Sequence, residues 1–273
     1  MSLAAHQLAR HGEQGSGRRS RLAATGVVVH RNYLTYRRVW WVFLSGFLEP
    51  ALYLFSIGVG VGRLVTGFEV DGQVISYAAF VAPGMLAFAA MNGTLLDATM
   101  NFFFKLKFSK TFQQMLATPL TTRDIAVGEL TWSVARGAVY SLAFLVLMLT
   151  TGLVSSWWAV LALPASVLIG IAFGAVGMAM TTYMRSFQDF EWITLLTLPM
   201  FLFSATFYPV TAYPTWLQWV VEVTPLYRGT VMVRELTTGT VSLASLVSVG
   251  YLVVLAVIGM LVVRRRLDRL LLT

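Results

Sequence analysis

Long apolar runs divide the chain into six segments, which are separated by shorter polar or aromatic connections. They cover residues 40–62, 78–104, 126–150, 158–182, 192–209 and 243–263. Each run has roughly 20 residues and almost no charge, which is the length of helix that crosses a hydrocarbon core of ~30 Å. The pattern therefore predicts an all-α, polytopic membrane protein with six transmembrane helices over residues 39–263.

The composition supports this prediction and excludes several functions. Hydrophobic residues make up 57% of the chain and charged residues 12%, whereas soluble domains carry about 25% charged residues. The chain has no cysteine, which excludes disulfides, thiolate metal sites and cysteine nucleophiles. In a membrane protein, we interpret the net charge of +8 as setting the orientation of the chain in the membrane and as contacting anionic lipid headgroups. We therefore expect no nucleic-acid partner.

The distribution of Lys and Arg predicts which connections face the cytoplasm. Of the 20 basic residues, 16 lie in the N-terminal segment, the second and fourth connections and the C-terminal tail, and three lie in the other connections. Because basic loops are retained in the cytoplasm, we expect a multi-pass protein of the cell membrane with both termini inside. Residues 1–20 are predicted to be a disordered cytoplasmic tail, and residues 264–273 a basic one.

Residues 21–38 are predicted to form an amphipathic helix. Val28, Val29, Tyr33 and Tyr36 recur at roughly helical spacing, with arginines between them. Such a helix lies in the headgroup layer of membrane lipids. A solvated basic linker remains the alternative.

The second connection also contains a short amphipathic segment. Thr111 to Ala117 can form a helix in which Phe112, Met115 and Leu116 share one apolar face. Such a face fits a groove on a soluble partner, or it rests on lipid. The pattern alone leaves both interpretations open.

The end of this segment and the start of the next helix carry local signals. Thr118 precedes Pro119 and is therefore disfavoured in the helical region. Thr121 or Thr122 can cap the following helix, and Asp124 in its first turn is favoured by the helix dipole. We expect a short helix, a kink, and then entry into the third run.

The fifth connection is rich in aromatic residues and proline. One short helix is expected to have Pro214 at its first position and to carry Trp216 and Trp219. A second is expected to start after Thr224 at Pro225, a favourable cap and first turn. Since each is too short to cross a bilayer, we interpret them as helices that enter from the outer face and turn back.

Four charged residues lie within the predicted spans. A charge at the bilayer centre costs at least ~3 kcal/mol, so Glu49 and Asp97 either line a transport path or are paired in the structure. Asn101 and other polar neighbours favour pairing for Asp97. Glu129 and Arg136, seven residues apart, share a helix face. We favour structural ion pairing for these two, within or between helices, over a link to a gate.

Three motifs stand out in the chain: residues 47–62 read FLEPALYLFSIGVGVG, residues 112–137 read FQQMLATPLTTRDIAVGELTWSVARG, and residues 204–236 read SATFYPVTAYPTWLQWVVEVTPLYRGTVMVREL. They resemble motifs of ABC-2 type export permeases, in particular the drug and lipo-oligosaccharide branch that includes nodulation-factor export. The resemblance covers nearly all of the chain after residue 30.

The resemblance implies that the segment around ATPL is a coupling helix, which fits a cleft of an ATP-binding subunit. It assigns this role to Lys110, Thr111, Phe112, Met115, Leu116, Thr118, Pro119, Arg123 and Asp124. The chain has no GxxxxGK[ST] motif, so we expect no cofactor in it and no enzyme activity of its own. ATP and Mg²⁺ would bind to a separate ATP-binding cassette subunit. Two such subunits and a second permease copy are expected.

The predicted function is export of an amphipathic substrate, such as a glycolipid, a lipid-linked saccharide or a hydrophobic drug. Possible residues of the substrate path are Glu49, Asp97, Phe201, Phe207, Tyr208, Trp216 and Trp219. For each aromatic residue, packing in the core or against lipid is an alternative. A membrane-embedded enzyme and an ATP-independent secondary transporter are the competing functions. No catalytic motif surrounds Glu49 or Asp97, and the unequal connections do not suggest internal repeats.

Overall fold

The computed structural model describes residues 23–39, 42–62, 68–70 and 73–272. The predicted tail of residues 1–20 and the first residues of the predicted amphipathic helix lie outside this part. The described chain is helical almost throughout, which confirms the all-α class. The exception is an antiparallel hairpin of β1 (Phe68–Val70) and β2 (Gln73–Ile75).

Helices of very different lengths make up most of the described part of the first half of the chain. They are the N-terminal helix (residues 23–36), η1 (Arg37–Val39), α2 (Val42–Gly60), α3 (Tyr77–Leu96), the π-helical turns η2 (Asp97–Asn101) and η3 (Phe104–Phe108), α4 (Thr111–Leu116) and α5 (Thr122–Thr150). The second half contains η4 (Trp157–Leu161), α6 (Ala162–Thr181), η5 (Phe187–Phe190), α7 (Glu191–Leu202), η6 (Val210–Ala212), α8 (Thr215–Val223), α9 (Pro225–Thr238) and α10 (Leu243–Leu271).

Within the described residues, four helical segments are long and apolar enough to cross a membrane: Tyr77–Phe108, Thr122–Thr150, Trp157–Thr181 and Leu243–Leu271. They correspond to four of the six predicted runs. The predicted fifth run, 192–209, is wrong as one continuous helix, because α7 ends at Leu202. Its 12 residues span roughly 18 Å, and an irregular segment follows.

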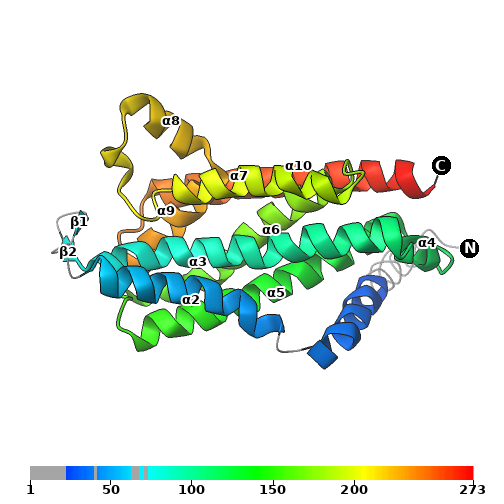
Figure 1. Cartoon of the computed structure of the whole chain (residues 1–273), viewed down its shortest axis with the longest axis horizontal. Coiled ribbons are helices and arrows are strands. Elements are labelled where there is room, and N and C mark those ends of the chain that lie inside the picture. The colour runs from blue at the N-terminus through cyan, green and yellow to red at the C-terminus, as the bar shows by residue number, and fades with distance from the viewer. Residues whose placement is uncertain (1–22, 40–41, 63–67, 71–72, 273) are drawn as a thin grey trace, which may run out of the picture.

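The long helices run roughly along the long axis of the molecule (Figure 1). Helix α3 lies in the middle: 83% of the most apolar part of Tyr77–Phe108 is buried, against 28% for α10. The N-terminal helix, α4 and the C-terminal end of α10 lie at one end, and the hairpin and α8 lie at the other (Figure 1).

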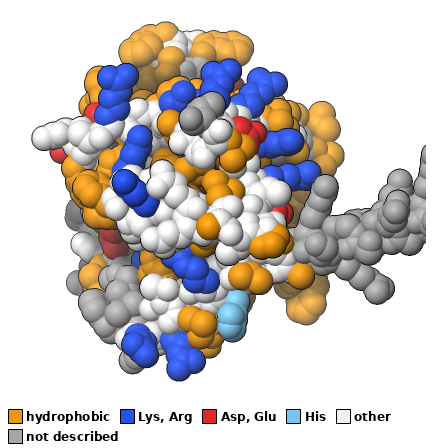
Figure 2. Space-filling model, turned by 90° about the vertical axis from the view of Figure 1, so that its right-hand side faces the viewer, with side chains coloured by type: hydrophobic (Ala, Val, Ile, Leu, Met, Phe, Trp, Pro, Cys, Tyr) orange, Lys and Arg blue, Asp and Glu red, His pale blue; other side chains and the backbone are white. Residues whose placement is uncertain are grey.

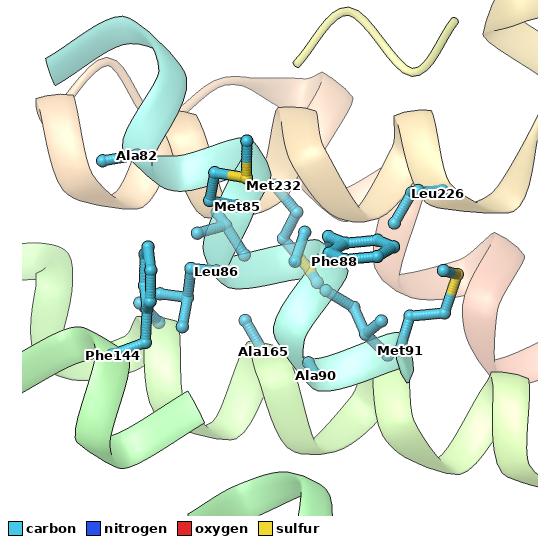
Figure 3. Close-up of a cluster of buried hydrophobic side chains, with 14 of the residues drawn as sticks. Ala82, Met85, Leu86, Phe88, Ala90, Met91, Phe144, Ala165, Leu226 and Met232 are labelled. Carbon is cyan, nitrogen blue, oxygen red and sulfur yellow. The ribbon is translucent and has the colours of Figure 1, made fainter. Parts of the chain in front are cut away.

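Two apolar clusters hold the bundle together. The larger surrounds the first half of α3, whose Met85, Leu86 and Met91 pack among residues from neighbouring helices, including Phe144 of α5 and Leu226 of α9 (Figure 3). The second cluster joins the π-helical segment after α3 to α4, α5, α6 and α10. Inside a membrane such side chains leave lipid and not water, so close packing between the helices, more than the hydrophobic effect, fixes them relative to one another.

A glycine stripe on α6 lets α3 approach closely. A Cβ at Gly174 would lie 2.8 Å from side-chain carbons of Thr94 and Leu130, and one at Gly177 would lie 2.6 Å from Leu95. Small residues at such spacing are typical of close helix packing in membranes.

Several local signals in the sequence are confirmed. Helix α4 begins at Thr111, and Thr121 caps α5 in a capping box with Asp124. Helix α9 begins at Pro225, directly after Thr224. Helix α8 begins at Thr215 with Pro214 as its N-cap residue, so the helix starts one residue later than predicted.

Candidate functional site

The apolar face of α4 packs inside this chain. Phe112 is fully buried and Met115 is 8% exposed, and both belong to the second cluster, with Leu116 packed at its edge. The Phe112 ring also stacks near Phe102, with the ring centres 5.0 Å apart. A partner's groove cannot receive this face while α4 packs against its own bundle, and the coupling role of the segment stays a prediction.

The exposed side of the α4 segment is polar. Lys110, Thr118, Pro119 and Arg123 are exposed, as is Gln113, while Thr111 is half-buried. Lys110 adopts a left-handed conformation with φ 48°, which costs a residue with a Cβ about 1–2 kcal/mol. This residue forms the sharp turn between η3 and α4.

The start of α5 is tied to the end of α10. The Asp124 carboxylate accepts a hydrogen bond from the Thr121 backbone N–H at 3.1 Å and is therefore occupied within the cap. The Thr122 hydroxyl donates to the Asp268 carboxylate. Arg266 Nη2 donates to the carbonyl oxygen of Thr182 at 3.3 Å, so α10 also holds the end of α6.

Two ion pairs join the π-helical extension of α3, which leads into α4, to helix α5. Lys105 Nζ lies 2.5 Å from Glu129 Oε2, and Arg136 Nη1 lies 3.2 Å from Asp97 Oδ1. Glu129 and Asp97 are 2% exposed. Glu129 and Arg136 thus each belong to an ion pair, but these pairs join them to a neighbouring segment rather than to one another. We call these four residues the charge network.

Further donors converge on Asp97. Ser133 Oγ donates to its carboxylate at 2.8 Å and Tyr36 OH at 3.2 Å, and the side-chain amide of Asn101 also donates to it. Arg136 Nε donates to Tyr140 OH at 2.9 Å. These donors satisfy the hydrogen-bonding capacity of the buried carboxylate.

The π-helical turns bring the two ion pairs into register. In an α-helix each residue adds about 100°, so the eight residues from Asp97 to Lys105 would leave their side chains roughly 80° apart. A π-turn holds more residues, and this interval contains η2 and the start of η3. Both side chains therefore face α5, where Glu129 and Arg136 are separated by about two α-helical turns.

The N-terminal helix docks on this network. Val28 is fully buried against Gly128, where a Cβ would lie 2.6 Å from the Val28 Cβ. Asn32 Oδ1 accepts from Lys105 Nζ at 3.0 Å, and Tyr36 donates to Asp97 as described. Burial raises the pKa of Tyr36, and the Asp97 carboxylate adds to the effect. The phenol therefore keeps its proton and remains a donor.

The predicted path residues do not form one site. Glu49 is exposed on α2, whereas Asp97 lies in the charge network. Phe201 is buried in the larger cluster, 5.3 Å from Phe207 between ring centres. The remaining three are on the surface, with exposed fractions of 55% for Tyr208, 69% for Trp216 and 69% for Trp219.

Sequence reasoning missed Lys105 and Tyr36 as members of the network. A signal was present: Asp97 and Lys105 carry the order minus–plus, and Glu129 and Arg136 carry the same order on the next, antiparallel helix. Because the two segments run antiparallel, Asp97 meets Arg136 and Lys105 meets Glu129. The eight-residue spacing concealed this match, because it fits one helix face only with π-turns.

Comparisons with known proteins show which sequences this chain resembles. The family model described as ABC-2 type transporter matches residues 23–238. Nodulation protein J of Rhizobium leguminosarum bv. viciae is 32% identical over 249 residues, which covers 89% of this chain and 94% of that protein. Nodulation protein J of Rhizobium meliloti (strain 1021) is 32% identical over 215 residues, covering 78% and 80%. The inner membrane transport permease YadH of Escherichia coli (strain K12) is 22% identical over 201 residues, covering 72% and 75%.

Proposed function

The chain belongs to the ABC-2 type transporter family, and from this premise we propose that it is the permease subunit of an exporter driven by a separate ATP-hydrolysing subunit. The observation that carries the proposal is the match over residues 23–238, a range that contains α4, the charge network and the outer helices. The chain itself has no P-loop motif, so the hydrolysing subunit is a different polypeptide.

Mechanical continuity between α4 and the spanning helices supports this function. Helix α4 is held by the second cluster, and directly above it the ion pairs join α3 and its extension to α5. Truncating one partner of a buried pair costs about 3–5 kcal/mol, so the network resists separation of these helices. A displacement of α4 by an ATPase subunit is then passed to the bundle instead of being absorbed in a loop.

We further propose that the chain crosses the membrane six times, with α2 and the broken α7 as the two additional crossings. The protein then lies in the cell membrane, with the basic end that carries α4 on the cytoplasmic side. Glu49 supports a dimer, because a carboxylate exposed to lipid on a spanning helix costs at least ~3 kcal/mol. A second permease copy or a wet passage between two copies would cover it. The substrate is then an amphipathic molecule that leaves between them.

An enzyme function has less support. Asp97, one of the two candidate acids, is held in an ion pair with Arg136 and is not available as a catalytic acid. The described residues include no group of three or more His, Asp or Glu side chains that could hold a metal ion.

Co-expression with an ATP-binding cassette subunit from the same genome tests the proposal. We expect the two proteins to co-purify through a tag on the permease, and ATP-dependent transport of a fluorescent glycolipid into inverted vesicles. The matched control is the same complex with the P-loop lysine of the ATPase replaced by alanine, which should bind but not transport. Transport that is undiminished without the ATPase would refute the proposed function.

A further inference from the structure

An apolar cavity of about 400 Å³ lies between α6 and α7. We call it the α6–α7 cavity. Two stripes of side chains at helical spacing face it, and residues where α8 meets α9 line it as well. The stripes are Phe173, Val176 and Met180 on α6 and Ile193, Leu196 and Met200 on α7. These two helices are therefore separated by a space over much of their common length.

Helix α7 is packed firmly into the bundle at one position. Phe201, near its C-terminal end, is its single buried residue, and the Phe201 ring centre lies 4.0 Å from that of Phe88 on α3. The cavity-facing side chains of α7 have no partner atoms across the space. Because side chains that line a void lose dispersion contacts, this arrangement is stabilised by an occupant that fills the cavity.

The lining of the cavity indicates that its occupant is a hydrocarbon. Its two hydroxyl groups are used within their own helices: Thr197 Oγ1 donates to the carbonyl oxygen of Ile193 at 2.8 Å, and Thr224 Oγ1 donates to that of Val221 at 2.7 Å. No charged residue is among those that line the cavity. A polar ligand would lose its bonds to water here without gaining others, whereas an acyl chain loses none.

A polar hollow continues the cavity at the connection between α6 and α7. It has a volume of about 460 Å³, and its lining includes Met180, Tyr183, Arg185, Asp189 and Trp192. We call it the Arg185 hollow. Because Met180 lines both spaces, they meet along the seam between the two helices. One molecule with a polar end and an apolar chain can therefore occupy both.

The Arg185 hollow offers one group of each charge. The Arg185 side chain is exposed and forms no ion pair with a described residue. Asp189 Oδ2 accepts the backbone N–H groups of Arg185 at 2.6 Å and of Ser186 at 3.1 Å. These hydrogen bonds lower the pKa of Asp189, so its carboxylate is charged at neutral pH.

Two further charges lie beside the hollow and leave this balance even. The Arg266 guanidinium lies 4.2 Å from the ring centre of Tyr183, and Glu191 is exposed in the first turn of α7. Neither residue lines the hollow. An occupant that complements this surface is therefore zwitterionic rather than purely anionic.

The position of the two spaces matches one leaflet of the membrane. The connection between α6 and α7 lies at the same end as α4 (Figure 1), where the Phe190 and Phe103 ring centres are 5.2 Å apart. Lys and Arg side chains are distributed over this end (Figure 2), which is the cytoplasmic side in the topology proposed above. The 12 residues of α7 span roughly 18 Å, just over half of a hydrocarbon core of ~30 Å. A chain that follows α7 from the hollow therefore reaches the middle of the bilayer.

We propose that the Arg185 hollow and the α6–α7 cavity together bind one phospholipid of the cytoplasmic leaflet whose headgroup carries an amine, such as phosphatidylethanolamine. Its phosphate accepts hydrogen bonds from Arg185, and its ammonium group pairs with Asp189 beside the Trp192 ring. One acyl chain passes Met180 and fills the cavity. The choice of leaflet rests on the proposed topology. The lipid is a resident part of the fold that holds α7 in place, and it is not the exported substrate.

Two substitutions with matched controls test this assignment. Thr197→Phe fills the cavity, and Thr194→Phe makes the same change at an exposed position of α7 outside it. Asp189→Asn removes the negative charge but keeps an acceptor for the backbone N–H groups, and Glu191→Gln is its control. The delipidated permease, in detergent and without an ATPase, is titrated with dioleoyl phosphatidylethanolamine or dioleoyl phosphatidylglycerol. Native mass spectrometry measures the affinity for the first bound lipid, and thermal unfolding shows that each variant is folded.

The expected result is one phosphatidylethanolamine bound at least ~5-fold more tightly than phosphatidylglycerol, the effect of one charged contact at a partly wet site. Thr197→Phe should weaken the binding of both lipids at least ~5-fold through the lost chain contacts. Asp189→Asn should reduce the preference for the amine headgroup to less than ~2-fold, and both controls should stay within ~2-fold of the wild type.

Three outcomes overturn the proposal. The first is lipid binding that Thr197→Phe leaves unchanged or, if that variant does not fold, a headgroup preference that Asp189→Asn leaves unchanged. The second is tighter binding of phosphatidylglycerol by the wild type. The third is a change of oligomeric state in light scattering for Thr197→Phe with unchanged lipid affinity, which assigns the cavity to a second permease copy. Because the ATPase is left out, these failures are distinct from the loss of ATP-dependent transport that would refute the proposed function.

Discussion

Replacing Asp97 by asparagine should destabilise the protein more than any other single neutralisation of a charge in the described spans. Asparagine keeps the shape but replaces one acceptor oxygen by an amide that donates hydrogen bonds. Arg136, Ser133, Tyr36 and Asn101 all direct donors at this carboxylate. The substitution therefore leaves donors opposed to donors and a buried guanidinium without its counter-charge.

The expected cost is about 3–5 kcal/mol, the usual effect of removing one partner of a buried ion pair. For a protein of this size, 1 kcal/mol lowers Tm by roughly 2–4 °C, so the midpoint should fall by on the order of 6–20 °C. Thermal unfolding of the purified chain in detergent measures the shift. Glu191→Gln is the control: it makes the same chemical change at an exposed site and should alter Tm by less than about 2 °C.

A second variant separates pairing from simple loss of packing. If the cost of Asp97→Asn arises from the unpaired charge of Arg136, then adding Arg136→Gln should recover at least ~1 kcal/mol, as coupled neighbours do in double-mutant cycles. The physical account of the network would be refuted by equal Tm shifts for Asp97→Asn and Glu191→Gln. It would also be refuted by a double variant whose loss equals the sum of the two single losses.

Three further substitutions test the packing. Phe112→Asp should prevent folding of the chain alone, seen as loss of a monodisperse peak in detergent, because it places a carboxylate in a fully buried position. Gly137→Ala should lower Tm by about 2–12 °C, because its Cβ would lie 2.1 Å from Thr94 Oγ1. Arg234→Met removes the hydrogen bond that Arg234 Nη2 donates to the carbonyl oxygen of Ala205 at 2.7 Å. The segment around residue 205 should then open more often, so a cysteine placed there in this cysteine-free chain should react at least ~5-fold faster with a maleimide.

Each of these expectations has a result that contradicts it. A Phe112→Asp permease that is stable alone but does not bind the ATPase would restore the apolar face of α4 as a docking surface. An unchanged Tm for the glycine variant would mean that α3 and α5 separate at little cost. Equal cysteine reactivity with and without the arginine would mean that the segment after α7 is held by other contacts.

Short-range signals in the sequence predicted the local structure well. The cap at Thr121, the break before Pro225 and the short helix from Thr111 each depend on residues within one turn. The apolar runs likewise marked four helices of membrane-spanning length. Such features need no knowledge of the neighbouring helices, because sterics and local hydrogen bonds determine them.

Features that depend on neighbouring helices were harder to predict. Periodicity showed that Phe112 and Met115 share an apolar face, but it could not show that the chain itself covers that face. The spacing of Asp97 and Lys105 fits one face only where the helix contains π-turns, and no residue pattern signalled them. The fifth run looked continuous because Phe203 and its neighbours are apolar, yet the helix ends at Leu202.

The connections around α4 explain how this helix can serve the proposed mechanism although its apolar face is buried. Only Ser109 and Lys110 separate η3 from α4, and Lys110 is held in a left-handed turn. The return to α5 passes through Pro119, whose φ is restricted, and ends at the Thr121 cap. A helix with a free apolar face and flexible connections would be displaced without moving the bundle. Helix α4 is instead buried at Phe112 and joined by short, restrained segments, so a partner can act on its polar side and displace α3, α5 and the end of α10 with it.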